Sequence, residues 1–185
     1  HKVFGEALAI LAGDALHAMA FEFFAMGGRI EIITDVARAI GTGGLVGGQV
    51  YDLEAEKESP SPELVEKIHL NKTAALLTAS LRVGAMMADA SKRDLQAITQ
   101  YGKKIGLAFQ IIDDILDIVA DESELGKSVG SDIEHDKSTY PAVFGLEKSR
   151  EMAGALISEA KRALPSDKDN SAFNVIADFI FERSH

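Results

Sequence analysis

The 185-residue sequence contains no cysteine and only four prolines, and it carries fewer basic than acidic side chains. Without cysteine, disulfide bonds and thiolate metal sites are excluded, and a reducing, cytoplasmic compartment fits this composition. The formal net charge of −10 argues against nucleic-acid binding and against docking on anionic lipid, both of which need clustered basic residues. A small anionic substrate stays compatible with this charge, because a few lysines around a metal ion can reverse the local field.

The scarcity of proline favours long helices. None of the four prolines interrupts a long periodic segment, and no stretch alternates for long with the period of a strand, so the pattern predicts an all-α protein. Its length and its 46% apolar content suit one helical domain, residues 1–185, with one core. Ser61 followed by Pro62 is a typical helix start, and the polar segment 123–138 is interpreted as an ordered loop. We expect helices at residues 3–26, 30–41, 44–56, 61–88, 91–122, 139–164 and 171–183.

The most apolar early stretch, Ala7–Met26, is interrupted by Asp14, His17 and Glu22. A membrane span needs roughly 20 mostly apolar residues, so the polar interruptions favour a buried helix of a soluble protein. No signal peptide is visible ahead of this stretch. We therefore expect no transmembrane segment.

The predicted helices 61–88 and 91–122 are apolar around most of their circumference. Helices of this kind lie inside a bundle or at a subunit interface. Gly102 and Gly106 lie four residues apart in the second of them, although a glycine inside a helix costs about 1 kcal/mol relative to alanine. We expect these two glycines to allow close helix packing.

Three aspartates and one glutamine interrupt the apolar run 105–119. In helical geometry Asp113 and Asp117 project from one face, Asp114 points about 100° away, and Gln110 lies one turn earlier on the same side. A solvated helix face is the alternative interpretation, which the apolar neighbours disfavour. Clustered carboxylates need a partner, and Mg²⁺ is usually held by one or two carboxylates plus substrate phosphates. The sequence therefore predicts a magnesium site at Asp113, Asp114 and Asp117, with the first and last as the direct ligands.

Lysines that could hold a phosphate lie in two other segments. Lys72, followed by Thr73, sits inside the predicted helix 61–88, and Lys127 and Lys137 flank the polar loop after the aspartates. Taken alone, each of these lysines is best interpreted as a solvated surface charge. Carboxylates with a metal ion and converging lysines together would form a diphosphate clamp.

Five segments of the sequence resemble the trans-isoprenyl diphosphate synthases. Gly106–Asp117 resembles the second aspartate-rich motif of that family, and the other segments follow in the family's order and spacing. A lone Asp-Asp-x-x-Asp pattern is a weak signal, whereas five ordered segments that span essentially the whole chain are a strong one. The other four are Leu11–Leu16, Gly47–Leu53, His69–Ala74, and Leu125–Asp132 followed by Lys137–Pro141.

The resemblance implies an antiparallel helix bundle around a central cavity, the isoprenoid synthase fold, usually as a homodimer. It implies a prenyltransferase that uses Mg²⁺ to condense isopentenyl diphosphate with an allylic diphosphate, head to tail. Asp113 and Asp117 would bind magnesium, with Asp114 in or near the same shell. The other implied site residues are Lys72, Lys127 and Lys137 on the allylic diphosphate, Thr73 and Gln110 near the nascent cation, and Gln49 and Asp52 facing the metal cluster.

The sequence departs from the family pattern at its start. The family's first aspartate-rich motif and the paired arginines after it are not found, and His1–Glu6 resembles the stretch that follows them. The resemblance therefore implies that residues 1–185 are the C-terminal two-thirds of a family member, without its N-terminal helices. We expect this polypeptide alone to be inactive and a longer parent chain to be active.

Two other functions would use the same bundle. A class I terpene cyclase shares the magnesium and the ionisation step, but its Asn/Asp–Ser/Thr–Glu ligand set is not found after Asp117. A non-catalytic regulatory subunit would arise by loss of the first motif, but the retained aspartates and lysines argue against decay of the site. For the product, residues 41–49 and 181–185 look most like short-chain members of the farnesyl or geranylgeranyl type, which make C15 or C20 prenyl diphosphates.

Overall fold

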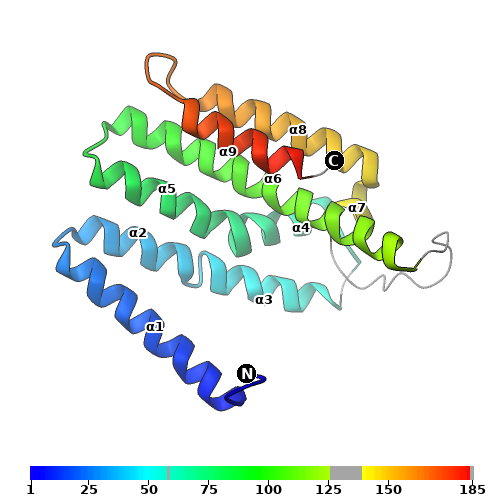
Figure 1. Ribbon diagram of the computed structural model, residues 1–185, viewed down its shortest axis with the longest axis horizontal. Coiled ribbons are helices and arrows are strands. Elements are labelled where there is room, and N and C mark those ends of the chain that lie inside the picture. The colour runs from blue at the N-terminus through cyan, green and yellow to red at the C-terminus, as the bar shows by residue number, and fades with distance from the viewer. Residues whose placement is uncertain (58, 126–138, 184–185) are drawn as a thin grey trace.

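The computed structural model describes residues 1–57, 59–125 and 139–183. Every regular element in these residues is a helix, and successive long helices run antiparallel (Figure 1), which confirms the predicted all-α fold. The elements are α1 (Glu6–Met26), α2 (Ile30–Ile40), α3 (Leu45–Ala55), α4 (Pro62–His69), the π-helical turn η1 (Leu70–Ala74), α5 (Ala75–Met87), α6 (Lys92–Leu125), α7 (Tyr140–Phe144), α8 (Leu146–Ala163) and α9 (Ser171–Glu182).

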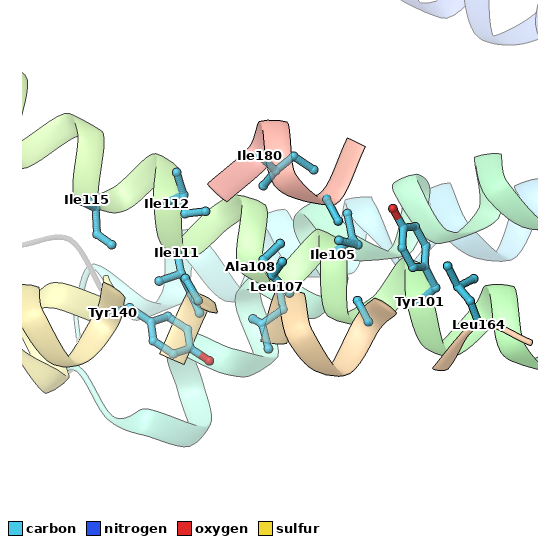
Figure 2. Close-up of a cluster of buried hydrophobic side chains, with 14 of the residues drawn as sticks. Tyr101, Ile105, Leu107, Ala108, Ile111, Ile112, Ile115, Tyr140, Leu164 and Ile180 are labelled. Carbon is cyan, nitrogen blue, oxygen red and sulfur yellow. The ribbon is translucent and has the colours of Figure 1, made fainter. Parts of the chain in front are cut away.

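Helix α6 lies in the middle of the bundle, with α5 on one side and α8 and α9 on the other (Figure 1). The side chains of Ile111, Ile112 and Ile115 on α6 are fully buried. They belong to one core cluster with Tyr140 from α7 and Ile180 from α9 (Figure 2). Burying one such side chain contributes about 1.5–3 kcal/mol, so this stretch of α6 forms the centre of the core.

The predicted helix 61–88 is one helical run that contains a π-helical turn. Ser61 caps its start as predicted, since its Oγ accepts a hydrogen bond from the Leu64 backbone N–H at 3.2 Å. The turn η1 then separates α4 from α5 without ending the helix. A π-helical turn holds one extra residue and occurs most often at functional sites, so η1 marks this segment for attention.

Two glycines bring neighbouring helices against η1. A Cβ atom on Gly48 of α3 would lie 2.2 Å from the Lys72 backbone nitrogen, and one on Gly106 of α6 would lie 2.5 Å from the Ala74 Cβ. A Cβ on Gly102 would also be tight, at 3.0 Å from Thr78. The predicted role of Gly102 and Gly106 in close packing is therefore confirmed, and Gly48 adds a third close approach.

The prediction of one helix over residues 139–164 is wrong, because two helices occupy this segment. Gly145 separates α7 from α8 with φ 81° and ψ 159°, a backbone conformation that side-chain-bearing residues rarely adopt. The start of α7 is capped by Thr139, whose Oγ1 accepts a hydrogen bond from the Ala142 N–H at 3.3 Å. The chain therefore turns between α7 and α8, and both of these helices pack against α6.

The prediction that Ala7–Met26 forms a helix is confirmed, but the prediction that this helix is buried is wrong. Helix α1 is fully described, and none of its residues is buried; Leu11 and Phe23 are 61% and 66% exposed. It packs mainly on α2 and diverges from the rest of the bundle (Figure 1). Within the described residues, no element covers most of its apolar surface.

By length and composition, α1 is also the one helix in the described part of the chain that could cross a membrane. Apolar helices from the core of a soluble protein satisfy the same two criteria, so these criteria do not separate the two cases. The expectation of no transmembrane segment therefore stays a prediction.

Candidate active site

A cleft of about 200 Å³ opens between α3, η1, α6 and the start of α7. Six of the residues predicted from the sequence line it, and they come from three separate segments of the chain. These residues are Asp52, Lys72, Thr73, Gln110, Asp114 and Asp117, and they are joined by Glu56, Ile68, His69 and Thr139.

A row of hydrogen-bonded side chains forms one wall of the cleft. The Thr73 hydroxyl donates to Gln110 Oε1 at 2.7 Å, and Gln110 Nε2 donates to Asp114 Oδ1 at 3.2 Å. Thr73 comes from η1, whereas Gln110 and Asp114 lie one turn apart on α6, as their spacing indicated. The structure brings Thr73 and Gln110 together, while their roles toward a substrate stay predictions.

Asp114 is buried, with only 7% of its surface exposed. Its Oδ2 accepts a hydrogen bond from the Tyr140 backbone N–H at 3.1 Å and lies 3.1 Å from His69 Nε2. Burial raises the pKa of Asp114 to about 6, and the hydrogen bonds from Tyr140 and Gln110 oppose that rise. At pH 7 the carboxyl group is therefore mostly ionised, and both of its oxygens already have protein partners.

Sequence reasoning missed His69, the last residue of α4. Burial lowers its pKa to about 4, so the imidazole is neutral at pH 7, and its Nε2 lies 3.1 Å from Asp114 Oδ2. Its ring stacks on that of Tyr140, with centroids 5.3 Å apart. His69 Nδ1 is buried and has no hydrogen-bond partner among the described residues, which costs about 1–3 kcal/mol. The available signal was a lone histidine between apolar residues, three positions before Lys72.

Lys72 lies where the cleft meets α3, and its Nζ donates to Asp52 Oδ2 at 2.5 Å. Both side chains are partly exposed, so a charged ligand can reach them. Gln49 is exposed and is not among the described residues that line the cleft. The sequence-based prediction did not include Glu56, which also lines the cleft. It follows Asp52 by four residues, and this spacing places the two side chains on the same face of a helix.

The two aspartates predicted as direct magnesium ligands lie in different surroundings. Asp117 is exposed and lines the cleft. Asp113 is not among the described lining residues, and its Oδ1 lies 3.5 Å from Arg183 Nη2. The Arg183 guanidinium also lies 5.2 Å from the centre of the Phe109 ring. In the described part of the chain, no three histidine, aspartate or glutamate side chains converge as a ready metal site.

The cleft nevertheless suits a Mg²⁺ ion that is bound together with phosphate groups. Asp117 from α6 and Asp52 and Glu56 from α3 offer hard oxygen ligands, with Lys72 beside them. Mg²⁺ is commonly held by one or two carboxylates plus substrate phosphates rather than by a complete protein cage. The donor set therefore fits magnesium bound together with a diphosphate.

Lys127 and Lys137 lie outside the described residues, together with most of the predicted loop 123–138. Helix α6 continues to Leu125, so that loop begins later than expected. Thr139, the first described residue after it, lines the cleft.

Comparison with known proteins places this arrangement in a family. The family described as Polyprenyl synthetase matches residues 1–176. This chain belongs to the polyprenyl synthetase family. A geranylgeranyl diphosphate synthase from Cyanophora paradoxa is 45% identical over 195 residues, which cover 100% of this chain and 65% of the relative. A farnesyl diphosphate synthase from Escherichia coli K12 is 43% identical over 197 residues, covering 100% of this chain and 66% of the relative.

A solved structure has the same fold. The crystal structure of a geranyltransferase from Helicobacter pylori, complexed with magnesium and isoprenyl diphosphate, superposes with a TM-score of 0.76 at 28% identity. The match covers 99% of this chain and 61% of that one. This polyprenyl synthetase chain thus spans about half to two thirds of the length of the curated relatives it matches, and the resemblance inferred from the five sequence segments is confirmed.

Proposed function

We propose that this chain carries the allylic diphosphate site of a prenyl diphosphate synthase. This prenyltransferase condenses isopentenyl diphosphate with an allylic diphosphate, head to tail, to give a C15–C20 product. The observation that carries the proposal is the cleft in which Lys72, exposed carboxylates and a row of oxygen acceptors meet. The family assignment and the farnesyl and geranylgeranyl diphosphate synthases among its relatives support the same reaction.

The diphosphate end of the site consists of lysines and carboxylates. We assign the allylic diphosphate to Lys72, with Lys127 and Lys137, and the magnesium to Asp113 and Asp117, with Asp114 in or near the same shell. Bound Mg²⁺ neutralises charge on the leaving diphosphate. An ammonium group has three donors, so Lys72 can keep its bond to Asp52 and still donate to a phosphate oxygen. Asp52 then completes the α3 side of the site, and the family resemblance assigns Gln49 to the same helix, outside the described residues that line the cleft.

The allylic end of the substrate lies against the wall made by Thr73 and Gln110. When the allylic C–O bond breaks, their oxygen atoms face the positive charge that forms, and preorganised dipoles of this kind are often the largest catalytic contribution. The double bond of isopentenyl diphosphate then attacks the cation, and a proton is lost to the departing diphosphate. Ile68 and the buried face of α6 keep water from quenching the cation.

The working form in this proposal is a cytoplasmic homodimer. The support for a dimer is the exposed apolar surface of α1, since large exposed apolar patches mark interaction surfaces. The support for a reducing compartment is the absence of cysteine from the sequence. Sedimentation of the purified protein measures the assembly directly.

Incubation with Mg²⁺, isopentenyl diphosphate and an allylic diphosphate tests the reaction in a longer parent chain and in these 185 residues. We expect elongated prenyl diphosphates from the parent and none from the 185 residues alone. Lys72→Ala in the parent should lower kcat/KM by about 100-fold or more, because it removes a charge that stabilises the leaving group. Lys103→Ala, at an exposed lysine of α6, is the matched control and should leave the rate unchanged.

Three results would contradict the proposal. Release of a hydrocarbon instead of an elongated diphosphate would indicate a terpene cyclase. A parent chain without any turnover would indicate a regulatory subunit. A fully active 185-residue chain would refute the expectation that this part alone lacks half of the site.

A further inference from the structure

His69 is a buried polar residue that the proposed reaction does not use. It is among the residues that line the cleft, is 3% exposed, and has Nε2 3.1 Å from Asp114 Oδ2. A phenylalanine would fill the same space, stack on Tyr140 in the same way, and leave no unpaired Nδ1. A histidine that serves only packing is therefore the less favourable choice at this position, and the approach of Nε2 to the Asp114 carboxylate is what distinguishes it.

The direction of each hydrogen bond along this wall of the cleft follows from chemistry. Both Asp114 oxygens act as acceptors, Oδ2 from the Tyr140 backbone N–H and Oδ1 from the Gln110 NH₂ group. At 3.1 Å from Oδ2, His69 Nε2 makes a favourable contact when it is the ring nitrogen that carries the proton. Gln110 Oε1 is then the atom that faces Thr73, and the Thr73 hydroxyl donates its proton to it. The unused lone pairs of Gln110 Oε1 and Thr73 Oγ1 are what these two groups can offer to the cleft.

We propose that His69 is a positioning residue: its Nε2–H fixes the Asp114 carboxylate, which orients the Gln110 amide so that Gln110 and Thr73 present oxygen lone pairs to the substrate. The catalytic consequence of this inference rests on the proposed function, whereas the orientation of the Gln110 amide does not depend on it. The Tyr140 backbone N–H is the second donor to the same carboxylate oxygen and ties this arrangement to the start of α7.

The orientation of the Gln110 amide matters because the opposite orientation would disfavour formation of the allylic cation. If the amide turned over, Gln110 Nε2 would face Thr73, and the Thr73 proton would have to point elsewhere, with the cleft as the open direction. Positive ends of dipoles would then line the place where an allylic cation forms, and fixed dipoles act strongly in a site from which water is excluded. Without His69, the Tyr140 N–H is the one donor left on Oδ2 among the described residues, so the carboxylate and the amide bonded to it are held less firmly.

Nuclear magnetic resonance on the 185-residue chain tests the orientation without any catalytic assay. Selective ¹⁵N labelling of its four glutamines gives four side-chain amide signals, of which Gln110 is assigned by its loss in Gln110→Glu. We expect a hydrogen-bonded, exchange-protected Gln110 amide in the wild type and in His69→Gln, which keeps a donor near the position of Nε2. His69→Phe should abolish that protection, and His17→Phe, at an exposed histidine of α1, should not.

Asp114→Asn provides a second variant of unchanged shape, should His69→Phe fail to fold. Its amide can keep an oxygen toward His69 and Tyr140 only by turning NH₂ toward Gln110, which forces the Gln110 amide to turn over. We expect the Gln110 amide signal to shift from its wild-type position, because the NH₂ group then faces the Thr73 hydroxyl instead of a carboxylate. A Gln110 signal that is identical in the wild type, His69→Phe and Asp114→Asn would overturn the proposal.

Steady-state kinetics of the parent chain test the consequence for the reaction. His69→Phe should lower kcat by about 100-fold through misplaced catalytic groups, change KM by no more than about threefold, and be largely rescued in His69→Gln. A turned amide in His69→Phe with an unchanged kcat would overturn the catalytic part of the inference. An inactive wild-type parent would instead refute the proposed function, and the resonance experiment would still decide whether His69 orients Gln110.

Discussion

Helices α1 and α6 are both long and apolar, and both carry acidic residues within the apolar run, yet their surroundings are opposite. Helix α6 is enclosed by α5, α7, α8 and α9, and even Asp114 is buried within it. Helix α1 rests mainly on α2, and its polar residues Asp14, His17 and Glu22 are exposed beside equally exposed apolar ones. Apolar content therefore sets the capacity of a helix to be buried, whereas the neighbouring elements decide which faces are covered.

The largest expected effect comes from deleting apolar atoms on the two helices. Ile112→Ala on α6 should lower the free energy of unfolding by about 2–5 kcal/mol, because it leaves a cavity in a fully buried site. Leu11→Ala on α1 should change it by about 0.5 kcal/mol or less, as at other exposed positions. Urea denaturation at low protein concentration measures both values.

The same two variants can test whether α1 remains exposed while α6 is buried. If a second copy covers α1 in a homodimer, the destabilisation by Leu11→Ala should grow as the protein concentration rises, because association stabilises only the covered form. The Ile112→Ala effect should not depend on concentration in this way. Equal losses for the two variants at low concentration would mean that α1 is covered within a single chain.

The second prediction concerns a buried and an exposed histidine. His69 has a pKa of about 4 when folded and about 6.5 when unfolded, so between these pH values only the unfolded chain takes up the proton. This histidine therefore lowers stability as the pH falls from 6.5 to 4, whereas Asp114, with a raised pKa, acts in the opposite direction. Relative to the wild type, His69→Gln should gain on the order of 3 kcal/mol over that interval.

Urea denaturation at a series of pH values measures this difference. His17→Gln on α1 controls for the loss of a histidine at an exposed position. Parallel stability profiles for the wild type and His69→Gln would show that burial does not hold the His69 imidazole neutral.

The smallest predicted effect tests how tightly α6 contacts its neighbours. Gly106→Ala should destabilise the protein by about 1–3 kcal/mol, because the new Cβ would lie 2.5 Å from the Ala74 Cβ and 2.6 Å from its Cα. Gly84→Ala on α5 meets open space and should stabilise by up to about 1 kcal/mol through helix propensity. A thermal unfolding series compares them, and a neutral Gly106→Ala would argue that α6 can move away from η1.

Much of the fold could be predicted because its signals are local. The predicted helices 30–41 and 171–183 match α2 and α9 to within a residue at each end, since apolar periodicity and polar flanks fix such boundaries. The break at Gly145 and the π-helical turn had no comparable signal. A glycine is tolerated inside a helix, and an extra residue in a turn depends on the helices that pack against it.

The candidate site likewise has a part that could be predicted from local sequence and a part that could not. Gln110 and Asp114 could be placed on one face of a helix from their spacing alone, and the structure joins them by a hydrogen bond. His69 reaches Asp114 from another helix, and no local pattern reveals a contact between residues so far apart in sequence. Asp113 likewise contacts Arg183, which lies 70 residues later in the chain, and no local pattern indicates that contact.

The π-helical turn has a consequence for comparing sequences. One additional residue in a turn advances the phase of every later position by about 100°, so a helical wheel drawn through residues 61–88 assigns the faces of α5 incorrectly. A relative with an ordinary α-turn at this place would align with a one-residue gap between His69 and Ala75. Deleting one residue from this chain would restore the regular phase, but it would also rotate Thr73 and Lys72 relative to α6.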